Sequence, residues 1–192
     1  MRTSLILIVT TIVFAGICWA DDALKIQDHN KKILASQNEH VQTISQKNLM
    51  KGKAFLTENS KKENVVTLPS GMQYQILREG KGEPPKPNDT VTVHYRGMLI
   101  NGKEFDSSYD RGEPATFQVN GVIRGWQEGL QLMRPGAEYK LFVPPELAYG
   151  ERGTGRKIGP NSTLIFDVKL LSIRGRKQYA PPKAEGIWPN DF

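Results

Sequence analysis

The spacing of apolar residues along the chain changes near residue 65. Residues 21–64 contain no proline and a single glycine, and they are rich in Lys, Gln, Asn and Glu. This composition, with sparse apolar residues at helical spacing, predicts a helix with a polar surface. After this segment, short apolar runs are separated by turn residues, which predicts strands. The sequence therefore indicates a helical segment followed by a folded domain.

The helical segment carries a weak seven-residue apolar repeat. Leu34, Val41 and Phe55 lie on one register of this repeat, but the same register places the polar residues Gln27 and Asn48 at the seam. Polar residues at a seam weaken a coiled coil, because its stability comes from apolar side chains that interlock there. Two interpretations remain open: a solvated helical spacer, and a helix that pairs two copies of the chain.

The folded domain alternates apolar and polar residues in the way that predicts antiparallel strands. Met72, Tyr74 and Ile76 alternate with glutamines after a Pro-Ser-Gly turn. The Asn-Gly pair at 101–102 follows another alternating run and is a strong hairpin signal. Further strand-like runs cover residues 90–99, 116–119, 138–143 and 163–173.

A single short helix interrupts these strands. Trp126, Leu130 and Met133 recur at helical spacing, which predicts one buried helix face. Gly129 lies within this helix, where glycine is normally unfavourable, so we expect it to mark a close approach to the sheet. Gly125 is expected to let the chain turn tightly into the helix. Several short strands and one helix predict an antiparallel α+β domain.

The first twenty residues have the composition of a secretory signal peptide. Arg2 precedes an almost uncharged apolar run from Leu5 to Cys18, and cleavage is expected after Ala20. An uncleaved membrane anchor and a lipid attached to Cys18 are the alternatives. Cleavage lowers the formal charge from +6 to +5, since it removes Arg2 and no acidic residue. It also removes the only cysteine, so the exported chain has no disulfide available.

These patterns together predict four regions. They are a signal peptide (1–20), an N-terminal helical segment (21–64), a folded domain (65–174) and an extended C-terminal tail (175–192).

The usual reactive groups are not arranged for proton transfer or covalent attack. Cys18 falls in the predicted signal peptide, and His94 stands alone in a strand pattern. The glycine-rich run 151–160 lacks the Lys-Ser/Thr ending and the preceding apolar strand of a phosphate loop. Basic residues near Arg174 lack interleaved aromatic residues, which favours a solvated tail over nucleic-acid binding.

The domain instead concentrates aromatic and aliphatic residues near turns, together with a few polar groups, which is the general form of a ligand pocket. Three blocks resemble, in order and spacing, the FKBP-type peptidyl-prolyl isomerases: VTVHYRGMLINGKEFDSSYDR, GVIRGWQEGLQLMRPG and VPPELAYGERGTGRKIGPNSTLIFDVKLLSI. The preceding KGKAFLTENSKKENVVTLPSGMQYQILREG is similar to the linker helix and first strand of the exported bacterial Mip-like (macrophage infectivity potentiator) branch. The resemblance implies a bent antiparallel sheet wrapped around the short helix, with a shallow apolar pocket between them.

The resemblance also implies which residues form this pocket. The expected catalytic residues are Tyr95, Phe105, Asp106, Tyr149 and Phe166, and the expected substrate contacts are Arg111, Val122, Ile123, Trp126 and Ile158. Trp126 is expected to form the floor. The backbone N–H of Ile123 and the hydroxyl of Tyr149 are expected to donate hydrogen bonds to carbonyls of the ligand.

Other positions refine the expected pocket. Asp106 and Arg111 are five residues apart and are expected to form an ion pair that holds the pocket wall. The chain departs from the best-known family pattern at Ala115, Thr154 and Lys157. These departures are expected to leave one side more open and to alter substrate preference and inhibitor affinity.

The function that the resemblance implies is acceleration of X-Pro bond isomerisation in exported proteins, which assists folding in the periplasm or at the cell exterior. It implies no cofactor and no metal. The implied ligands are proline-containing polypeptides and FK506- or rapamycin-type macrolides. The alternative function is a non-catalytic chaperone or surface binding module that uses the same pocket. A monomer and a homodimer through the N-terminal helix both remain open.

Overall fold

A computed structural model describes residues 4–175, with side chains from residue 24 onward. The predicted signal peptide (1–20) and, apart from Gly175, the predicted tail (175–192) lie outside the part with described side chains. The chain divides into two compact units, Met1–Thr43 and Ile44–Phe192. Among the residues that the structure describes, no helix combines the length and apolarity needed to cross a membrane.

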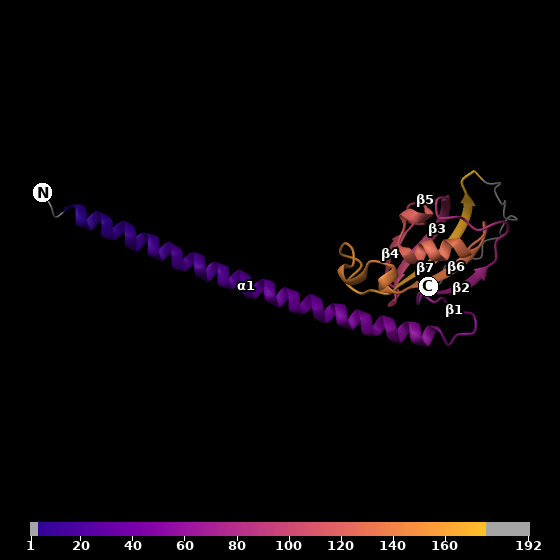
Figure 1. The fold of residues 1–192 in the computed structure, drawn as a ribbon, viewed down its shortest axis with the longest axis horizontal. Coiled ribbons are helices and arrows are strands. Elements are labelled where there is room, and N and C mark those ends of the chain that lie inside the picture. The colour runs from indigo at the N-terminus through magenta and orange to yellow at the C-terminus, as the bar shows by residue number, and fades with distance from the viewer. Residues whose placement is uncertain (1–3, 176–192) are drawn as a thin grey trace. The chain divides into compact units, whose positions relative to one another are not determined.

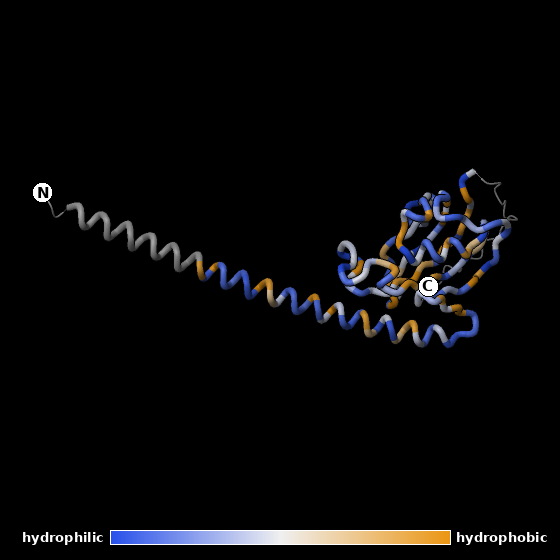
Figure 2. Tube along the Cα trace, viewed as in Figure 1, coloured by the Kyte–Doolittle hydropathy of each residue, from blue (hydrophilic) through white to orange (hydrophobic). Residues whose placement is uncertain are grey.

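The first unit is formed by helix α1 (Ser4–Asn59), which continues into the second unit. This confirms the predicted N-terminal helix. Within the first unit, Leu34 and Val41 are 64% and 50% exposed, so neither side chain packs against a core of its own. Figure 2 shows such apolar positions separated by hydrophilic ones along the described part of the helix.

The second unit is built on a seven-stranded antiparallel sheet with the order β1-β2-β6-β7-β3-β4, in which β5 also pairs with β3 (Figure 1). The predicted α+β class is therefore confirmed. The strands are β1 (Val66–Thr67), β2 (Gln73–Arg78), β3 (Thr90–Leu99), β4 (Glu104–Ser107), β5 (Ala115–Gln118), β6 (Glu138–Val143) and β7 (Leu164–Ile173). The long ladder between β3 and β7 forms the centre of the sheet.

Short helices connect some of these strands. Helix α2 (Arg124–Leu132) packs against β6 (Figure 1). Three single-turn 3₁₀ helices occupy the loops: η1 (Val119–Gly121), η2 (Pro145–Leu147) and η3 (Gly150–Arg152). Between α2 and the sheet lies the main hydrophobic core, whose members include Val91, Val93, Trp126, Leu130, Met133, Leu141, Phe166, Val168 and Leu170.

The opposite face of the sheet departs from the alternation prediction at Gln73. This side chain was expected to face solvent, but it is only 3% exposed. Its Nε2 donates to the Leu56 carbonyl at 2.8 Å, and its Oε1 accepts from Asn59 Nδ2 at 2.9 Å. The end of α1 covers this part of the sheet, and the rings of Phe55 and Phe142 lie 5.9 Å apart. Alternation shows which face is apolar, but not which distant segment covers the other face.

Two glycines of α2 explain how the helix lies so near the sheet. A Cβ at Gly129 would come 2.6 Å from Leu141 Cδ1, which bears out the predicted close approach. The expectation for Gly125 was wrong. It lies inside the helix without a positive φ, and a Cβ there would come 2.4 Å from Val143 Cγ1. Both glycines thus serve packing between the helix and the sheet.

Gly129→Ala is expected to destabilise the domain, although alanine is the better helix former by about 1 kcal/mol. Leu141 is fully buried, and the added methyl would come within 2.6 Å of its Cδ1, so it overpacks the core. Overpacking costs roughly 1–3 kcal/mol and should outweigh the gain in propensity. Denaturant unfolding measures the net change. In the control Gly121→Ala the methyl meets only Gln118 Cβ, at 3.8 Å. An unchanged or raised midpoint for Gly129→Ala would contradict the packing argument.

Candidate functional site

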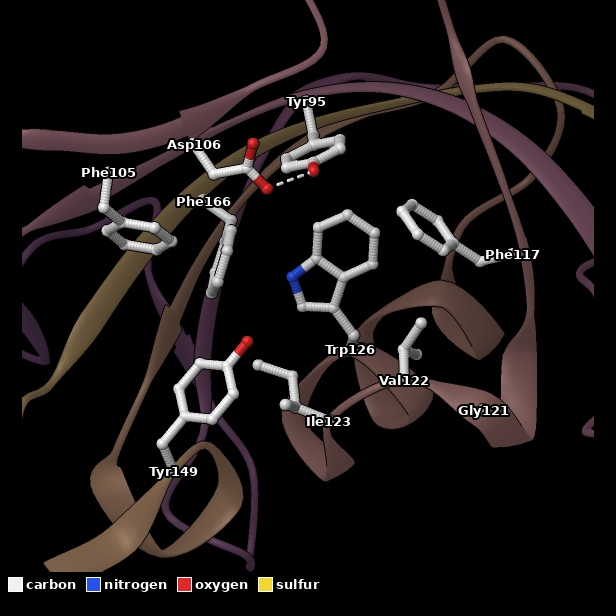
Figure 3. Close-up of a pocket in the computed structure, with 10 residues that line it drawn as sticks. All are labelled: Tyr95, Phe105, Asp106, Phe117, Gly121, Val122, Ile123, Trp126, Tyr149 and Phe166. Carbon is white, nitrogen blue, oxygen red and sulfur yellow. Dashed lines mark hydrogen bonds between the residues drawn. The ribbon is translucent and has the colours of Figure 1, made fainter. Parts of the chain in front are cut away.

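A pocket of about 360 Å³ opens between α2, the sheet and the loop after β6. Apolar and aromatic side chains form most of its lining, and the polar groups are few (Figure 3). Its lining residues are Tyr95, Phe105, Asp106, Phe117, Gly121, Val122, Ile123, Trp126, Tyr149 and Phe166. A concave apolar site with a few oriented polar groups is suited to a ligand that is itself mostly apolar.

Trp126 forms the floor of this pocket. The helix position puts its indole edge-on to three rings, with centroid distances of 5.1 Å to Tyr95, 5.7 Å to Phe117 and 5.4 Å to Phe166. Edge-to-face contacts of this kind fix ring orientation as well as burying area. The indole Nε1 is buried without a hydrogen-bond partner among the described residues, and in Figure 3 it faces the side of the pocket lined by Phe166.

A polar triad closes one wall. The Tyr95 hydroxyl donates a short hydrogen bond to Asp106 and accepts one from Arg111 Nη2 at 3.0 Å. Arg111 Nη1 also pairs with Asp106 Oδ1 at 2.6 Å, which is the ion pair expected from the sequence. The arginine lies over the Tyr95 ring, 5.4 Å from its centroid. Each member is thus held by two others, and the carboxylate is fixed at the pocket edge.

The charge state of the triad follows from its contacts. Burial raises the pKa of Asp106, but hydrogen bonds from Tyr95 and Arg111 outweigh burial and hold the pKa below its ordinary value. Burial, and then the bond to Asp106, raises the pKa of Tyr95. The pair is therefore a carboxylate and a neutral phenol at neutral pH. A carboxylate that stays ionised is an acceptor and does not supply a proton.

A β-bulge lets two consecutive residues of β4 reach the pocket. Gly97 pairs with Asp106 while Met98 pairs with Glu104, so Phe105 is the extra residue. In a regular strand, neighbouring side chains point to opposite faces, whereas a bulge re-aims one of them. Gly97 makes room for the re-aimed ring, because a Cβ there would lie 2.7 Å from Phe105.

The buried hydroxyl of Ser108 fixes the backbone behind the triad. It accepts from the Tyr95 N–H at 2.8 Å and lies 3.2 Å from the Tyr95 carbonyl. It also lies 3.0 Å from His94 Nδ1, and the His94 ring stacks on Tyr109 at 4.6 Å. Burial lowers the pKa of His94, with Lys169 adding to the effect. His94 is a structural residue outside the pocket lining.

Tyr149 brings a hydroxyl to the opposite wall. It lies between η2 and η3 and is 39% exposed. Figure 3 shows its hydroxyl directed toward the pocket interior, beside Ile123. Burial raises the pKa of Tyr149, and the charge of Asp106 adds to this shift. The group therefore remains a hydrogen-bond donor across the neutral range.

The structure brings most of the ten sequence-predicted residues together, but not all of them. Arg111 contacts the pocket only through Asp106 and Tyr95, and it is not a lining residue. Ile158 is a buried core residue and, unlike the equally buried Trp126 and Phe166, it is not a lining residue of the pocket. The other eight predicted residues are Tyr95, Phe105, Asp106, Val122, Ile123, Trp126, Tyr149 and Phe166, and all line the pocket.

Sequence reasoning missed Phe117 and Gly121 as lining residues. The signal for Phe117 was present, since it is two residues from Ala115 on β5 and therefore on the same face. Its ring packs 5.7 Å from Trp126 and supplies aromatic wall next to Ala115. Lys157, one of the positions at which the chain departs from the family pattern, contacts a pocket residue, because its Nζ donates to the Phe105 carbonyl at 2.8 Å. Thr154 pairs with Ile158 in an isolated bridge.

Ligand affinity is expected to be constant from about pH 5 to about pH 9. The depressed pKa of Asp106 means that its interactions contribute fully above its unfolded pKa and are lost only as pH falls through the lower folded value. The raised pKa of Tyr149 preserves its donor beyond pH 10.0. Titration of ligand binding by Trp126 emission at several pH values measures this plateau. A step between about pH 5 and pH 6.5, the direction in which burial shifts the pKa of His94, would contradict it.

Comparison with known families fits this fold and pocket. Residues 81–171 match the family described as FKBP-type peptidyl-prolyl cis-trans isomerase. Residues 17–76 match the family described as the domain amino terminal to FKBP-type peptidyl-prolyl isomerase. The crystal structure of FkpA from Escherichia coli is similar, with a TM-score of 0.75 and 46% identity over 78% of this chain and 70% of that chain. The chain belongs to the FKBP-type peptidyl-prolyl isomerase family.

Within this family the chain is similar to bacterial Mip and FkpA proteins. It is 55% identical over 127 residues to the peptidyl-prolyl cis-trans isomerase Mip of Coxiella burnetii, which covers 66% of this chain. It is 49% identical over 144 residues to the outer membrane protein MIP of Legionella longbeachae, which covers 75% of this chain. The chain spans 55% and 62% of the lengths of these two relatives.

Proposed function

We propose that this protein accelerates cis-trans isomerisation of X-Pro bonds in polypeptides, with the pocket over Trp126 as its active site. The observation that carries the proposal is an apolar pocket whose few polar groups, Asp106 and Tyr149, lie on opposite walls. The family membership and the similarity to a Mip protein named as an isomerase support it. A proline ring fits over an indole floor, and FK506- or rapamycin-type macrolides are proposed ligands of the same pocket.

Isomerisation requires rotation about an amide bond with a barrier of roughly 18–20 kcal/mol. Water stabilises the planar, charge-separated amide more than the twisted one, so transfer into an apolar pocket raises the ground state relative to the transition state. The Tyr149 hydroxyl and the Ile123 N–H are proposed to orient the substrate carbonyl in the twisted form. Each ~1.4 kcal/mol removed from the barrier gives a tenfold faster rotation. The reaction needs no nucleophile and no change of protonation.

The direct test is a protease-coupled assay with a proline peptide, in which cis-to-trans conversion limits cleavage. The full chain should accelerate conversion above the buffer rate, and a macrolide should inhibit it. Tyr149→Phe keeps the ring and removes the donor, so it should retain peptide binding and lose part of the rate. Absence of acceleration by the wild type would overturn the proposal. Suppression of client aggregation without acceleration would instead favour the chaperone alternative.

We also infer that the protein acts outside the cytoplasm. The apolar run at residues 5–18, with Ala20 at the expected cleavage point, supports export. One similar protein, from Legionella longbeachae, is named an outer membrane protein. Mass measurement of the chain recovered from the producing cell should show loss of residues 1–20. Recovery of the intact chain would overturn cleavage.

We infer further that two copies pair through α1. Leu34, Val41 and Phe55 belong to the same seven-residue register. Of these, Phe55 is already covered by the folded domain, since its ring packs on Phe142. The same register leaves Leu34 and Val41 exposed, which supports their burial against a second copy. Light scattering of the full chain distinguishes the dimer from a monomer.

A further inference from the structure

The Tyr149 hydroxyl is carried on a loop whose shape strand pairing does not determine. Gly150, Gly153 and Gly155 all have positive φ, between 57° and 61°, and the segment holds only the single turn η3 and one isolated bridge. Backbone of this kind has many accessible conformations, because glycine adopts both signs of φ readily. Contacts from elsewhere must therefore hold the loop in place.

Asn161 makes one such contact directly behind Tyr149. Its backbone N–H donates to the Gly150 carbonyl at 2.8 Å. Asn161 has φ of 52° and is the only residue other than glycine at positive φ in the described part of the chain. Asparagine tolerates this conformation better than most residues, but the conformation still needs outside support.

Helix α1 supplies that support from 116 residues away in sequence. Asn161 Nδ2 donates to Ser45 Oγ at 2.8 Å, and Asn48 Nδ2 donates to the carbonyl of the preceding Pro160 at 2.8 Å. Ser45 and Asn48 are three residues apart, so they share one face of the helix. Two side chains on one face of the helix thus form hydrogen bonds with two consecutive residues, Pro160 and Asn161, and Asn161 in turn bonds to Gly150.

Helix α1 is itself held against the domain by close contacts that fix its position. A Cβ at Gly52 would come 2.2 Å from Thr163 Oγ1, so the helix backbone lies directly against the residue before β7. Further along, the Phe55–Phe142 contact and the buried Asn59–Gln73 hydrogen bond set its rotation and register. These contacts bring Ser45 and Asn48 to the loop in one fixed orientation.

We propose that Asn161, held by Ser45 and Asn48 of α1, is the positioning residue for Tyr149, so that the end of α1 is a working part of the isomerase site. The proposal rests on the proposed function of the pocket. The side chain of Asn161 bonds to Ser45, its backbone N–H bonds to the Gly150 carbonyl, and Gly150 directly follows Tyr149. It predicts that residues far from the ligand alter catalysis through one hydroxyl.

The test is a set of variants in the full chain. Ser45→Ala combined with Asn48→Ala should lower kcat/KM about threefold to tenfold, because small misplacements of a catalytic group cost rate. Ser45→Thr keeps a hydroxyl and should retain the wild-type value when Asn48 is present. Gln46→Ala, an exposed position on the same turn, is the matched control and should change nothing.

A double-mutant cycle separates positioning from general destabilisation. In a Tyr149→Phe background the Ser45/Asn48 substitutions should have almost no further effect, because the group that they position is already absent. An equal loss in both backgrounds, or no loss in either, would overturn the proposal.

Amide hydrogen exchange of the Asn161 N–H, followed by NMR, reports on its hydrogen bond to Gly150 independently of catalytic activity. Protection should fall in the Ser45/Asn48 variant and remain in Gln46→Ala. Unchanged protection would overturn the proposal even in an active enzyme. An inactive wild type with lowered protection in the variant would overturn the proposed function alone, since α1 would still be shown to hold the loop.

Discussion

Trp126→Ala is expected to lower kcat/KM at least about 100-fold, which corresponds to ~2.7 kcal/mol of transition-state stabilisation. The indole is the pocket floor and is only 4% exposed, and its removal deprives the rings of Tyr95, Phe117 and Phe166 of a shared edge contact. Truncating a buried aromatic side chain also costs roughly 3–5 kcal/mol of stability. The protease-coupled assay measures the first effect and denaturant unfolding measures the second.

Trp126→Phe distinguishes the floor from the core. Phenylalanine preserves an aromatic surface and part of the edge contacts, so this variant should recover most of the stability that Trp126→Ala loses. The smaller ring leaves space under the ligand, so affinity should stay below the wild-type value. The emission of Trp126 should also change when a proline-mimicking ligand binds to the wild type. Full activity of Trp126→Ala, or emission insensitive to ligand, would show that the indole is only a core residue.

Asp106→Leu is expected to lower kcat/KM about 10- to 100-fold with a smaller effect on stability. The substitution removes the acceptor of the Tyr95 hydroxyl and the partner of Arg111, so both side chains lose their fixed positions. The Arg111–Asp106 pair is 43% and 44% exposed, and exposed pairs contribute little to folding. Kinetic assay and thermal unfolding of the same sample compare the two effects.

Glu104→Leu is the matched control for Asp106→Leu. It lies on the same strand two residues away, but the β-bulge separates the two positions, and Glu104 pairs with Arg96 at 2.9 Å outside the pocket lining. The control should therefore retain kcat/KM. If Asp106→Leu were fully active, or if both variants lost activity equally, the carboxylate would have no specific role at the pocket edge.

Much of the fold follows from local pattern. Along β7 every second residue, Leu164, Phe166, Val168 and Leu170, is buried, as the alternating sequence pattern of a half-buried strand predicts. The helical spacing of Trp126 and Leu130 correctly assigned the buried face of α2. Such patterns succeed because a side chain's direction is set by its own backbone, with a period of two in strands and 3.6 in helices.

The residues of the pocket were predicted in a different way. Nothing in local spacing links Tyr95 to Tyr149, and the resemblance of three ordered blocks supplied that link. The resemblance also carried Ile158 into the pocket, but Ile158 is not among the lining residues. A matched motif position conveys a location along the chain, whereas the direction of its side chain is set by the backbone of the folded protein.

The sequence by itself determined the strands, the short helix, the helical segment before them and, through the ordered motifs, the family. Only the tertiary structure decided that the β-bulge turns both Phe105 and Asp106 into the pocket. Only the tertiary structure, likewise, buried Gln73 under α1 and joined Ser45 to Asn161. The physical reason is range. Periodicity reports interactions within one element, whereas these contacts join segments that meet only when the helix packs on the finished sheet.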